Sequence, residues 1–502
     1  CQKRQAKVSN SSKETFLSSI YSVMFQIYIV NIKKVKKIIF TLMEKEKLLQ
    51  KKYSAVFISS NGLENKAEYA RRRKKLLSQL KSPLILAGIA REPGSEEEYT
   101  STWNRLVQTP EFLYLTGINQ AGCFLILDPT KEESKQETLF LPEKDTFKEF
   151  WTGLKLGVEA NGNAEEASVL TGFDSIKFSC DLENHVKELL QSEEIQSLNT
   201  IFSSENKENH YRKFFKKLSK WAKSYQKNVE NVAEIHILER LVLSDFQIAE
   251  LKKAVGYTGD AFKAALKKWN MFRTERDLAL RLDYEMLKRN YSDLAFPTIA
   301  ASGENACCLH YVKNDEPLVE GNMVLLDFGA RSGSVCADIS RTVPVSKKYS
   351  PLQKLLYNIV LETQKFHEAQ VAPGKTLQEL NDRAWDYLNE KLAEFCQKYE
   401  GSMELLYEKR PHGISHFIGE EVHEGGILNR KSLMNLPLKK GMLISNEPGV
   451  YGKFSATING VFYSETLGIR IEDDLLLTET GCENISKEIP KNIEDLEYIL
   501  KS

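Results

Sequence analysis

The strongest constraint on the fold comes from acidic residues that lie in or beside apolar segments. Asp327 follows the run Met-Val-Leu-Leu, and Glu472 lies among the apolar residues of LGIRIEDDLLLT. Burying an uncompensated carboxylate costs several kcal/mol per ion, so these segments cannot be ordinary core strands. The chain must bury them and also bring positive charge to their carboxylates.

A β-hairpin is predicted around the first two acidic residues. In MVLLDFGARSGSVCADISRTVPV, Asp327 follows an apolar strand, Asp338 sits in a second strand, and residues 331–334 form the turn. The midpoint of the two aspartates is the middle of that turn, which predicts that they lie directly opposite each other, with Cβ atoms roughly 5 Å apart. The alternative is a solvent-facing pair, but the Val-Leu-Leu run favours burial.

A second pair of acidic residues lies near the end of the chain. Glu447 follows an apolar strand in MLISNEPGVY, and Glu472 is predicted to lie inside a buried strand. Arg470 is expected on the same face of that strand, where it can orient or partly neutralise the acidic cluster. The four carboxylates together carry four negative charges, which two divalent cations would balance.

Three of the eight histidines fall within HGISHFIGEEVHE, residues 412–424. A single histidine is usually a packed or solvated residue, but this segment holds three. The His-Glu-x-x-His pattern is absent, and Gly413 and Gly419 disfavour a regular helix, so we expect a strand and a loop. One imidazole beside four carboxylates suits a pair of Mn²⁺, Co²⁺, Fe²⁺ or Zn²⁺ ions, and two histidines remain for chemistry.

Composition excludes other classes of partner. Lys plus Arg and Asp plus Glu number 69 each, so the chain has no overall field that attracts nucleic acid or an anionic membrane. The Lys-rich segment 205–228 is therefore expected to be a solvated helix face. Eight cysteines without a Cys-x-x-Cys pair fit reduced thiols in a cytoplasm.

The first part of the chain, residues 1–62, is predicted to be an extension of doubtful status. Its apolar stretch 20–32 is too short to span a bilayer, and the basic run KKVKK follows it instead of preceding it. Because the chain begins with Cys instead of Met, the true start is expected at Met24 or Met43.

Two domains are predicted after this extension. Residues 63–240 begin with an amphipathic helix and continue with the apolar runs PLILAGIA, EFLYLTGI, CFLILDP and ETLFLP between turn residues, which predicts an α/β domain. In residues 241–502, the capping-box pattern at 244–247 opens a long amphipathic helix.

The order of the acidic residues and the histidine resembles the ligand set of aminopeptidase P and prolidase, the proline-specific enzymes of the pita-bread metallopeptidases. The five matching positions are Asp327 in LLDFGA, Asp338 in ADISRT, His416 in HGISHFIG, Glu447 in NEPGVY and Glu472 in IRIEDD. The stretches SGENACCLHY, with His310, and VHE, with His423, resemble the family's two non-ligand histidine motifs. The resemblance is strong over about 245–480 and looser over 66–240.

This resemblance implies an α/β (α+β) fold with a pita-bread catalytic domain at 241–502 and a creatinase-type domain at 63–240. It further implies that two divalent ions, usually Mn²⁺, are bound. Asp338 and Glu472 would bridge both ions, Asp327 would complete one, and His416 with Glu447 would complete the other.

The resemblance also implies roles in catalysis. Glu447 would carry a proton to the leaving nitrogen, and His310 and His423 would donate hydrogen bonds to the oxygen that gains charge. His412, Tyr451 and Arg470 look like supporting residues. Two departures from the family pattern, VHE for the commoner VHD and Ser445-Asn446 before Glu-Pro-Gly, touch no ligand.

The implied activity is removal of an N-terminal residue that precedes proline, from tripeptides and longer peptides. A dipeptidase of the prolidase type shares every ligand and is the first alternative. A metal-free pita-bread binding module is the second, although such modules lose ligands and this chain has all five. The expected partners are peptides with proline in the second position, and a homo-oligomer stays open.

Overall fold

The computed structural model describes residues 40–41, 43–53, 66–88, 108–202, 209–288, 292–407 and 410–502. The chain divides into two compact units, residues 1–54 and 55–502. In the first unit, residues 40–41 and 43–52 are helical. The apolar stretch at 20–32 lies outside the described residues. Within the described ranges, no helix is long and apolar enough to cross a membrane.

The first part of the second unit is built on one six-stranded sheet with the order β4-β3-β2-β1-β5-β6. Strand β1 pairs antiparallel with β2 and parallel with β5, so the sheet is mixed. Its strands are β1 Leu84–Ala87, β2 Phe124–Leu127, β3 Glu137–Leu141, β4 Ile176–Phe178, β5 Ser197–Thr200 and β6 Asn228–Asn231. The helices are α2 Lys66–Leu77, α3 Pro110–Thr116, α4 Thr146–Thr152, α5 Glu165–Thr171, α6 Leu182–Gln191, α7 Asn209–Ser224 and α8 Ala233–Arg240, with short 3₁₀ turns η3 Glu133–Lys135 and η4 Ser179–Asp181.

One of the four apolar runs forms a helix instead of a strand. Three of the four apolar runs form strands β1, β2 and β3, but EFLYLTGI lies in helix α3. Thr109 caps the start of this helix because its side chain accepts from the Phe112 N–H, and Pro110 suits the first turn. Gly117 ends it in a left-handed conformation with φ of 70°. These local signals outweigh the strand propensity of the apolar run.

Residues 209–224 of the Lys-rich segment form helix α7, as predicted. Among its described side chains, Leu218, Trp221 and Ala222 are buried, whereas the lysines face solvent. Leu218 and Trp221 pack against the same core as Ile85 of β1 and Phe140 of β3. The helix therefore uses its apolar stripe to cover the sheet.

The second part of this unit contains four small sheets, with orders β11-β10-β7, β12-β9-β8, β13-β16-β17 and β14-β15-β18-β19. Their strands are β7 Ser292–Leu294, β8 Ile299–Ser302, β9 Met323–Phe328, β10 Ala330–Ser332, β11 Val335–Cys336, β12 Ile339–Pro344, β13 Ser402–Leu405, β14 Phe417–Ile418, β15 Leu443–Asn446, β16 Gly449–Ile458, β17 Val461–Arg470, β18 Asp473–Leu477 and β19 Cys482–Asn484. The helices are α9 Asp245–Leu266, α10 Glu275–Leu287, α11 Pro351–Glu368, α12 Leu377–Lys398, α13 Arg430–Met434 and α14 Ile493–Lys501, with 3₁₀ turns η5 Trp269–Met271 and η6 Gly303–Cys307. The predicted division at residue 240 stays a prediction.

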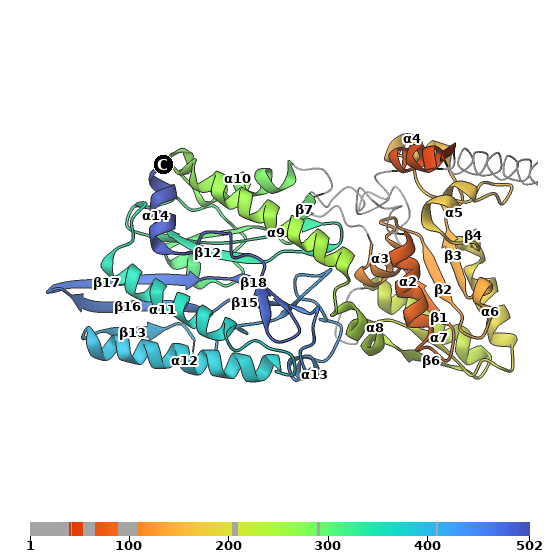
Figure 1. Ribbon diagram of the computed structural model, residues 1–502. Coiled ribbons are helices and arrows are strands. Elements are labelled where there is room, and N and C mark those ends of the chain that lie inside the picture. The colour runs from red at the N-terminus through yellow and green to blue at the C-terminus, as the bar shows by residue number, and fades with distance from the viewer. Residues whose placement is uncertain are drawn as a thin grey trace, which may run out of the picture. The chain divides into compact units, whose positions relative to one another are not determined.

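Helices cover both sides of these strands (Figure 1). Helix α9 packs on β10 and β11, and α11 packs on β16 and β17. The core between them includes Phe262, Leu326, Leu356 and Ile469, all of them buried. Helix α9 opens with the predicted capping box between Ser244 and Gln247. This framework holds the loops at the strand ends in fixed positions.

Gly329 lies where β9 and β10 meet and allows a close backbone approach. A Cβ atom on Gly329 would lie 1.9 Å from the carbonyl oxygen of Ala337. Real Cβ contacts do not become so short, and a backbone oxygen cannot rotate away as a side chain can. The segment between Asp327 and Asp338 therefore contains this close approach and, beyond it, the antiparallel pair β10 and β11.

We predict that Gly329→Ala lowers the free energy of unfolding by about 3 kcal/mol, because the added methyl group overpacks the backbone. Gly256→Ala is the matched control. Gly256 lies within helix α9 and its added Cβ would meet no atom within 4 Å. This control should stabilise the protein by about 0.5–1 kcal/mol. Denaturant unfolding measures both values, and equal effects of the two variants would contradict the assigned contact.

Candidate metal centre

The five predicted ligands lie at the ends of strands that belong to neighbouring sheets. Asp327 is in β9, and Asp338 lies between β11 and β12. His416 directly precedes β14, Glu447 directly follows β15, and Glu472 lies between β17 and β18. The predicted strand and loop at 412–424 are present, with β14 as the strand.

Three of these side chains converge on one point. Asp338, His416 and Glu472 each offer a ligand atom, and these atoms all lie within 4.8 Å of one another. His416 Nε2 lies 3.5 Å from Asp338 Oδ2 and 3.3 Å from Glu447 Oε1. A divalent cation with oxygen and nitrogen ligands fits such a group.

The second nitrogen of His416 supports this assignment. His416 Nδ1 lies 3.1 Å from the carbonyl oxygen of Phe417, a contact that the tautomer with its proton on Nδ1 satisfies. Nε2 then presents a lone pair to two carboxylates, which is unfavourable without a cation between them. A backbone carbonyl that fixes the free nitrogen is the usual environment of a metal-ligating histidine.

Burial and mutual repulsion act on the acidic ligands. Asp338 is 5% exposed and Glu472 is 2% exposed. Burial is the largest cause that raises the pKa of Asp338, and the Asp327 charge adds to it. Burial likewise raises the pKa of Glu472, and the Asp338 charge adds to it. A bound cation would favour the ionised forms again.

The predicted pairing of the two aspartates is wrong. Asp327 pairs with Ser340, and the strands continue with Arg331 opposite Cys336 and Ser332 opposite Val335. The turn is therefore centred between Gly333 and Ser334, one residue later than predicted. Gly333 takes a φ of 57°, which suits the tight turn. Asp338 lies outside the strands, two positions before the residue opposite Asp327.

The predicted position of Glu472 inside a strand is also wrong. Glu472 lies in the two-residue link between β17 and β18, where its N–H donates to the Ser340 carbonyl at 3.0 Å. The Ser340 hydroxyl donates to Glu472 Oε2 at 2.7 Å. Because the strands break here, the backbone of Glu472 is not part of a β-ladder. Its carboxylate lies in the group with Asp338 and His416.

Arg470 holds the acidic cluster together. Its Nη2 donates to Asp327 Oδ2 at 2.6 Å and its Nε donates to the Ser340 hydroxyl at 2.8 Å. Arg470 thus reaches Glu472 through Ser340. The second oxygen of Asp327, Oδ1, is buried and has no hydrogen-bond partner among the described residues.

A chain of hydrogen bonds extends from Arg470 through Tyr451 to His412, whose ring lies beside Glu447. Arg470 Nη1 donates to the Tyr451 hydroxyl at 3.2 Å, and this hydroxyl lies 2.9 Å from His412 Nε2. His412 Nδ1 lies 2.8 Å from the Gly413 carbonyl and 3.5 Å from Glu447 Oε2. Burial lowers the pKa of His412 to about 4, so the neutral ring accepts from Tyr451 and donates to Gly413.

His310 and His423 lie beside this group. The ring centroids of His416 and His423 are 4.4 Å apart, and those of His310 and His423 are 6.5 Å apart. Both residues are exposed, unlike the acidic ligands. A molecule that reaches the cluster from solvent would therefore meet these two imidazoles.

Two residues that organise the site were missed in the sequence. Ser340 follows Asp338 by two positions, so strand alternation could have placed it on the same face. Glu275 is fully buried and accepts from the Ser302 N–H, the Tyr311 hydroxyl and the Glu316 N–H, which holds the segment around His310. In the sequence, the only indication of a special role for Glu275 is its position directly after Thr274, the residue that caps helix α10.

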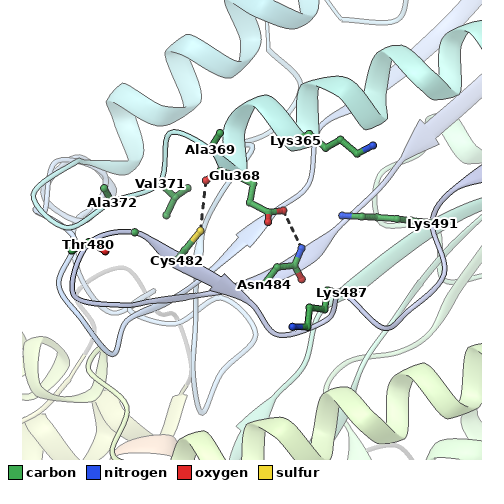
Figure 2. Close-up of a pocket in the computed structure, with 11 residues that line it drawn as sticks. Lys365, Glu368, Ala369, Val371, Ala372, Thr480, Cys482, Asn484, Lys487 and Lys491 are labelled. Carbon is green, nitrogen blue, oxygen red and sulfur yellow. Dashed lines mark hydrogen bonds between the residues drawn. The ribbon is translucent and has the colours of Figure 1, made fainter.

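A separate cavity of about 560 Å³ lies near the end of helix α11. Figure 2 shows Lys365, Lys487 and Lys491 around it, with Glu368 accepting a hydrogen bond from Asn484. Lys491 also donates to Asp473, the residue after Glu472. No candidate metal ligand lines this cavity, so it does not mark the site of the chemistry.

Comparisons with known proteins agree with this arrangement. Residues 249–479 match the family model of metallopeptidase family M24, and residues 69–198 match the aminopeptidase P N-terminal domain. The two matches cover separate parts of the chain in the same order as the two predicted domains.

Curated relatives and solved structures match over most of their length. The chain is 27% identical to Xaa-Pro aminopeptidase of Haemophilus influenzae, over 87% of this chain and 97% of that protein. It is 28% identical to intermediate cleaving peptidase 55 of Saccharomyces cerevisiae, over 87% and 84%. The structure of Pseudomonas aeruginosa aminopeptidase PepP matches with a TM-score of 0.71 and 25% identity, over 87% and 98%.

We predict that a divalent cation raises the melting temperature and that a chelator lowers it. A cation at 100 times its dissociation constant adds about 2.7 kcal/mol of stability. Asp338→Asn removes one of the repelling buried charges, so the chelated variant should melt above the chelated wild type and respond little to Mn²⁺. Asp386→Asn is the control, because this side chain is 76% exposed and lies outside the cluster. An unchanged Mn²⁺ response in Asp338→Asn would contradict the site.

Proposed function

Because the chain belongs to the aminopeptidase P group of the pita-bread metallopeptidases, family M24, we propose that it removes an N-terminal residue that precedes proline. It is a hydrolase whose substrates are peptides. The observation that carries this conclusion is the convergence of Asp338, His416 and Glu472, with Asp327 and Glu447 beside them, in this fold.

Two divalent cations per chain, assigned as Mn²⁺, are the proposed cofactor. Asp338 and Glu472 would bind both ions, Asp327 would bind one, and His416 with Glu447 would bind the other. The unpartnered Asp327 Oδ1 and the strong repulsion among the carboxyls support a count of two. When bound, such ions polarise a carbonyl oxygen and lower the pKa of water toward about 7.

Glu447 is the proposed proton carrier. It is half-buried beside His416 and His412, and desolvation is the largest cause that raises its pKa. A carboxyl with a raised pKa can take a proton and release it again near neutral pH. The Ser445 hydroxyl donates to Glu447 Oε1 at 3.4 Å, and Oε2 lies 3.5 Å from His412 Nδ1.

The two exposed histidines are the proposed hydrogen-bond donors to the substrate. His310 and His423 lie on the solvent side of His416. An imidazole N–H aimed at the carbonyl oxygen would stabilise the charge that develops during hydrolysis. Arg470 would hold Asp327 in place, and Tyr451 and His412 continue the hydrogen-bond chain from Arg470 to a position beside Glu447.

The preference for proline has a chemical reason. The bond before proline is a tertiary amide without an N–H, and the ring fixes φ near −65°. A peptidase that binds its substrate as an added strand loses a hydrogen bond there. The leaving group is a secondary amine that needs a proton, which Glu447 would supply.

The assigned roles predict two classes of variant. Asp338→Asn and Glu472→Gln should lose metal by elemental analysis, because each removes a shared ligand. His423→Ala should keep its metal and slow turnover by roughly 10²-fold, the scale of one lost transition-state donor. Equal metal loss in all three variants would contradict the division between ligands and donors.

Substrate length separates the proposed activity from its alternatives. With Mn²⁺, we expect cleavage of Xaa-Pro-Yaa tripeptides and longer peptides, and much slower cleavage when alanine replaces proline. Cleavage confined to Xaa-Pro dipeptides would instead identify a prolidase. Absence of any cleavage, with no stoichiometric metal, would identify a binding module. A cytoplasmic location and a homo-oligomer stay predictions, which fractionation and light scattering would test.

A further inference from the structure

The loop that carries His423 is built around buried acidic side chains. We call residues 419–425 the His423 loop. Glu420 is 4% exposed and Glu424 is 2% exposed, although His423 between them faces solvent. Carboxylates are rarely buried without partners, so their contacts decide the shape of the loop.

Glu424 bonds to the backbone on both sides of His423. Its Oε2 accepts from the Glu421 N–H at 3.1 Å, and its Oε1 accepts from the Gly425 N–H at 3.2 Å. The Glu424 N–H donates to the Phe417 carbonyl at 2.8 Å. The carboxylate also packs so closely that a Cβ on Gly419 would lie 2.6 Å from Oε2. These contacts close the loop around one side chain.

The cation that contacts Glu424 comes from the N-terminal half of the chain. Arg240 is the last residue of α8, and its Nη2 lies 2.7 Å from Oε1 and 2.9 Å from Oε2 of Glu424. Both side chains are 0% exposed. The same nitrogen lies 3.4 Å from Glu421 Oε2. The catalytic sheets therefore do not supply the positive charge that this loop needs.

A second arginine serves the other buried acid of the loop. Arg72 on α2 lies 3.3 Å from Glu420 Oε1, which also accepts from the Ser334 hydroxyl at 2.8 Å. Arg72 shares its guanidinium with Glu68 and the Tyr114 carbonyl. Arg240 is the sharper subject for a test, because its shortest contacts are with Glu424, the residue next to His423, whereas Glu421 and Glu111 lie 3.4 and 3.6 Å away.

Loss of Arg240 would leave Glu424 buried without its cation. Such a carboxylate takes up a proton or draws in water. In a protonated carboxyl, one oxygen carries a hydrogen and acts as a donor. The hydrogen bonds from the Glu421 and Gly425 amides to the two oxygens would then no longer both be strong. The backbone on both sides of His423 would then relax, and the ring would leave its place beside His416.

We propose that Arg240 is a positioning residue that sets His423 for catalysis by neutralising Glu424. This inference rests on the proposed function of His423 as a donor to the substrate. It makes the N-terminal half part of the catalytic machinery of its own chain. Arg240 has no contact with the candidate metal ligands, and its two shortest ion-pair contacts lie in the His423 loop, so its effect on turnover should pass through that loop.

A double-mutant cycle on the full chain tests this path. With Mn²⁺ and an Xaa-Pro-Yaa peptide, Arg240→Met should lower kcat roughly 10- to 100-fold, with metal content unchanged and KM changed less than about twofold. In the His423→Ala background, the same substitution should lower kcat less than about twofold, because the ring to be positioned is absent. An equal loss in both backgrounds would overturn the proposal.

Arg73→Met is the matched control. Arg73 is as buried as Arg240 and lies next to Arg72, but it pairs with Glu137 and the Leu115 carbonyl, away from the loop. It should lower the melting temperature and leave kcat near that of the wild type. A loss of kcat equal to that of Arg240→Met would assign the effect to general destabilisation and overturn the proposal.

A second experiment tests whether removing the charge of Glu424 restores activity to the Arg240→Met variant. Adding Glu424→Gln to Arg240→Met removes the uncompensated charge and keeps an amide oxygen that can accept from the backbone. The kcat of the double variant should be at least about threefold higher than that of Arg240→Met, and still below that of the wild type. A double variant no better than Arg240→Met would contradict the role given to the Glu424 charge.

Hydrogen exchange gives a readout that does not need activity. Amides of residues 417–428 should exchange faster in Arg240→Met than in Arg73→Met, and those of β18 should not differ. If the wild type cleaves no Xaa-Pro peptide, the proposed function fails, and this exchange result still decides whether Arg240 holds the loop. Unchanged exchange in the loop would overturn the inference even in an active enzyme.

Discussion

Repulsion among buried carboxylates is the constraint on which the rest of the catalytic half depends. Asp338 and Glu472 lie almost without solvent; burial raises the pKa of both, the charge of Asp327 adds to it at Asp338, and the charge of Asp338 adds to it at Glu472. The surrounding sheets can enclose them only because Arg470 and the hydroxyl of Ser340 contact the group and because a cation fits at its centre. The candidate ligands lie at strand ends. Inside a regular sheet, carboxylates on neighbouring strands would either lie too far apart to share a cation or lie directly opposite each other and repel.

Much of the site could be predicted from the sequence because its residues lie in short apolar motifs. The strand and loop around His416 and the capping box at Ser244 need only local patterns, and the five candidate ligands follow from the resemblance of their motifs to a known family. The turn between the aspartates could not be located, since Arg-Ser-Gly-Ser offers several positions to a turn and only the fold selects Gly333 for positive φ. Because the turn is centred one residue later than predicted, the residue opposite Asp327 is Ser340 instead of Asp338.

Other parts could not be predicted because they depend on distant contacts. The run EFLYLTGI has strand composition, and its caps at Thr109 and Gly117 decide for a helix. Arg240 and Glu424 lie 184 residues apart, and nothing in either local sequence indicates burial. Glu275 looks like an ordinary first-turn acid, yet it accepts hydrogen bonds from three parts of the segment around His310.

The pairing of Arg240 with Glu424 bears on how chains of this kind can diverge. Aspartate at position 424 would end one methylene short of the guanidinium, so α8 would have to move or to offer a different side chain. The two partners come from different halves of the chain. A recombination event that joined this N-terminal half to the catalytic half of another lineage would therefore separate a matched pair. A substitution at either partner would leave the other buried without its counter-charge.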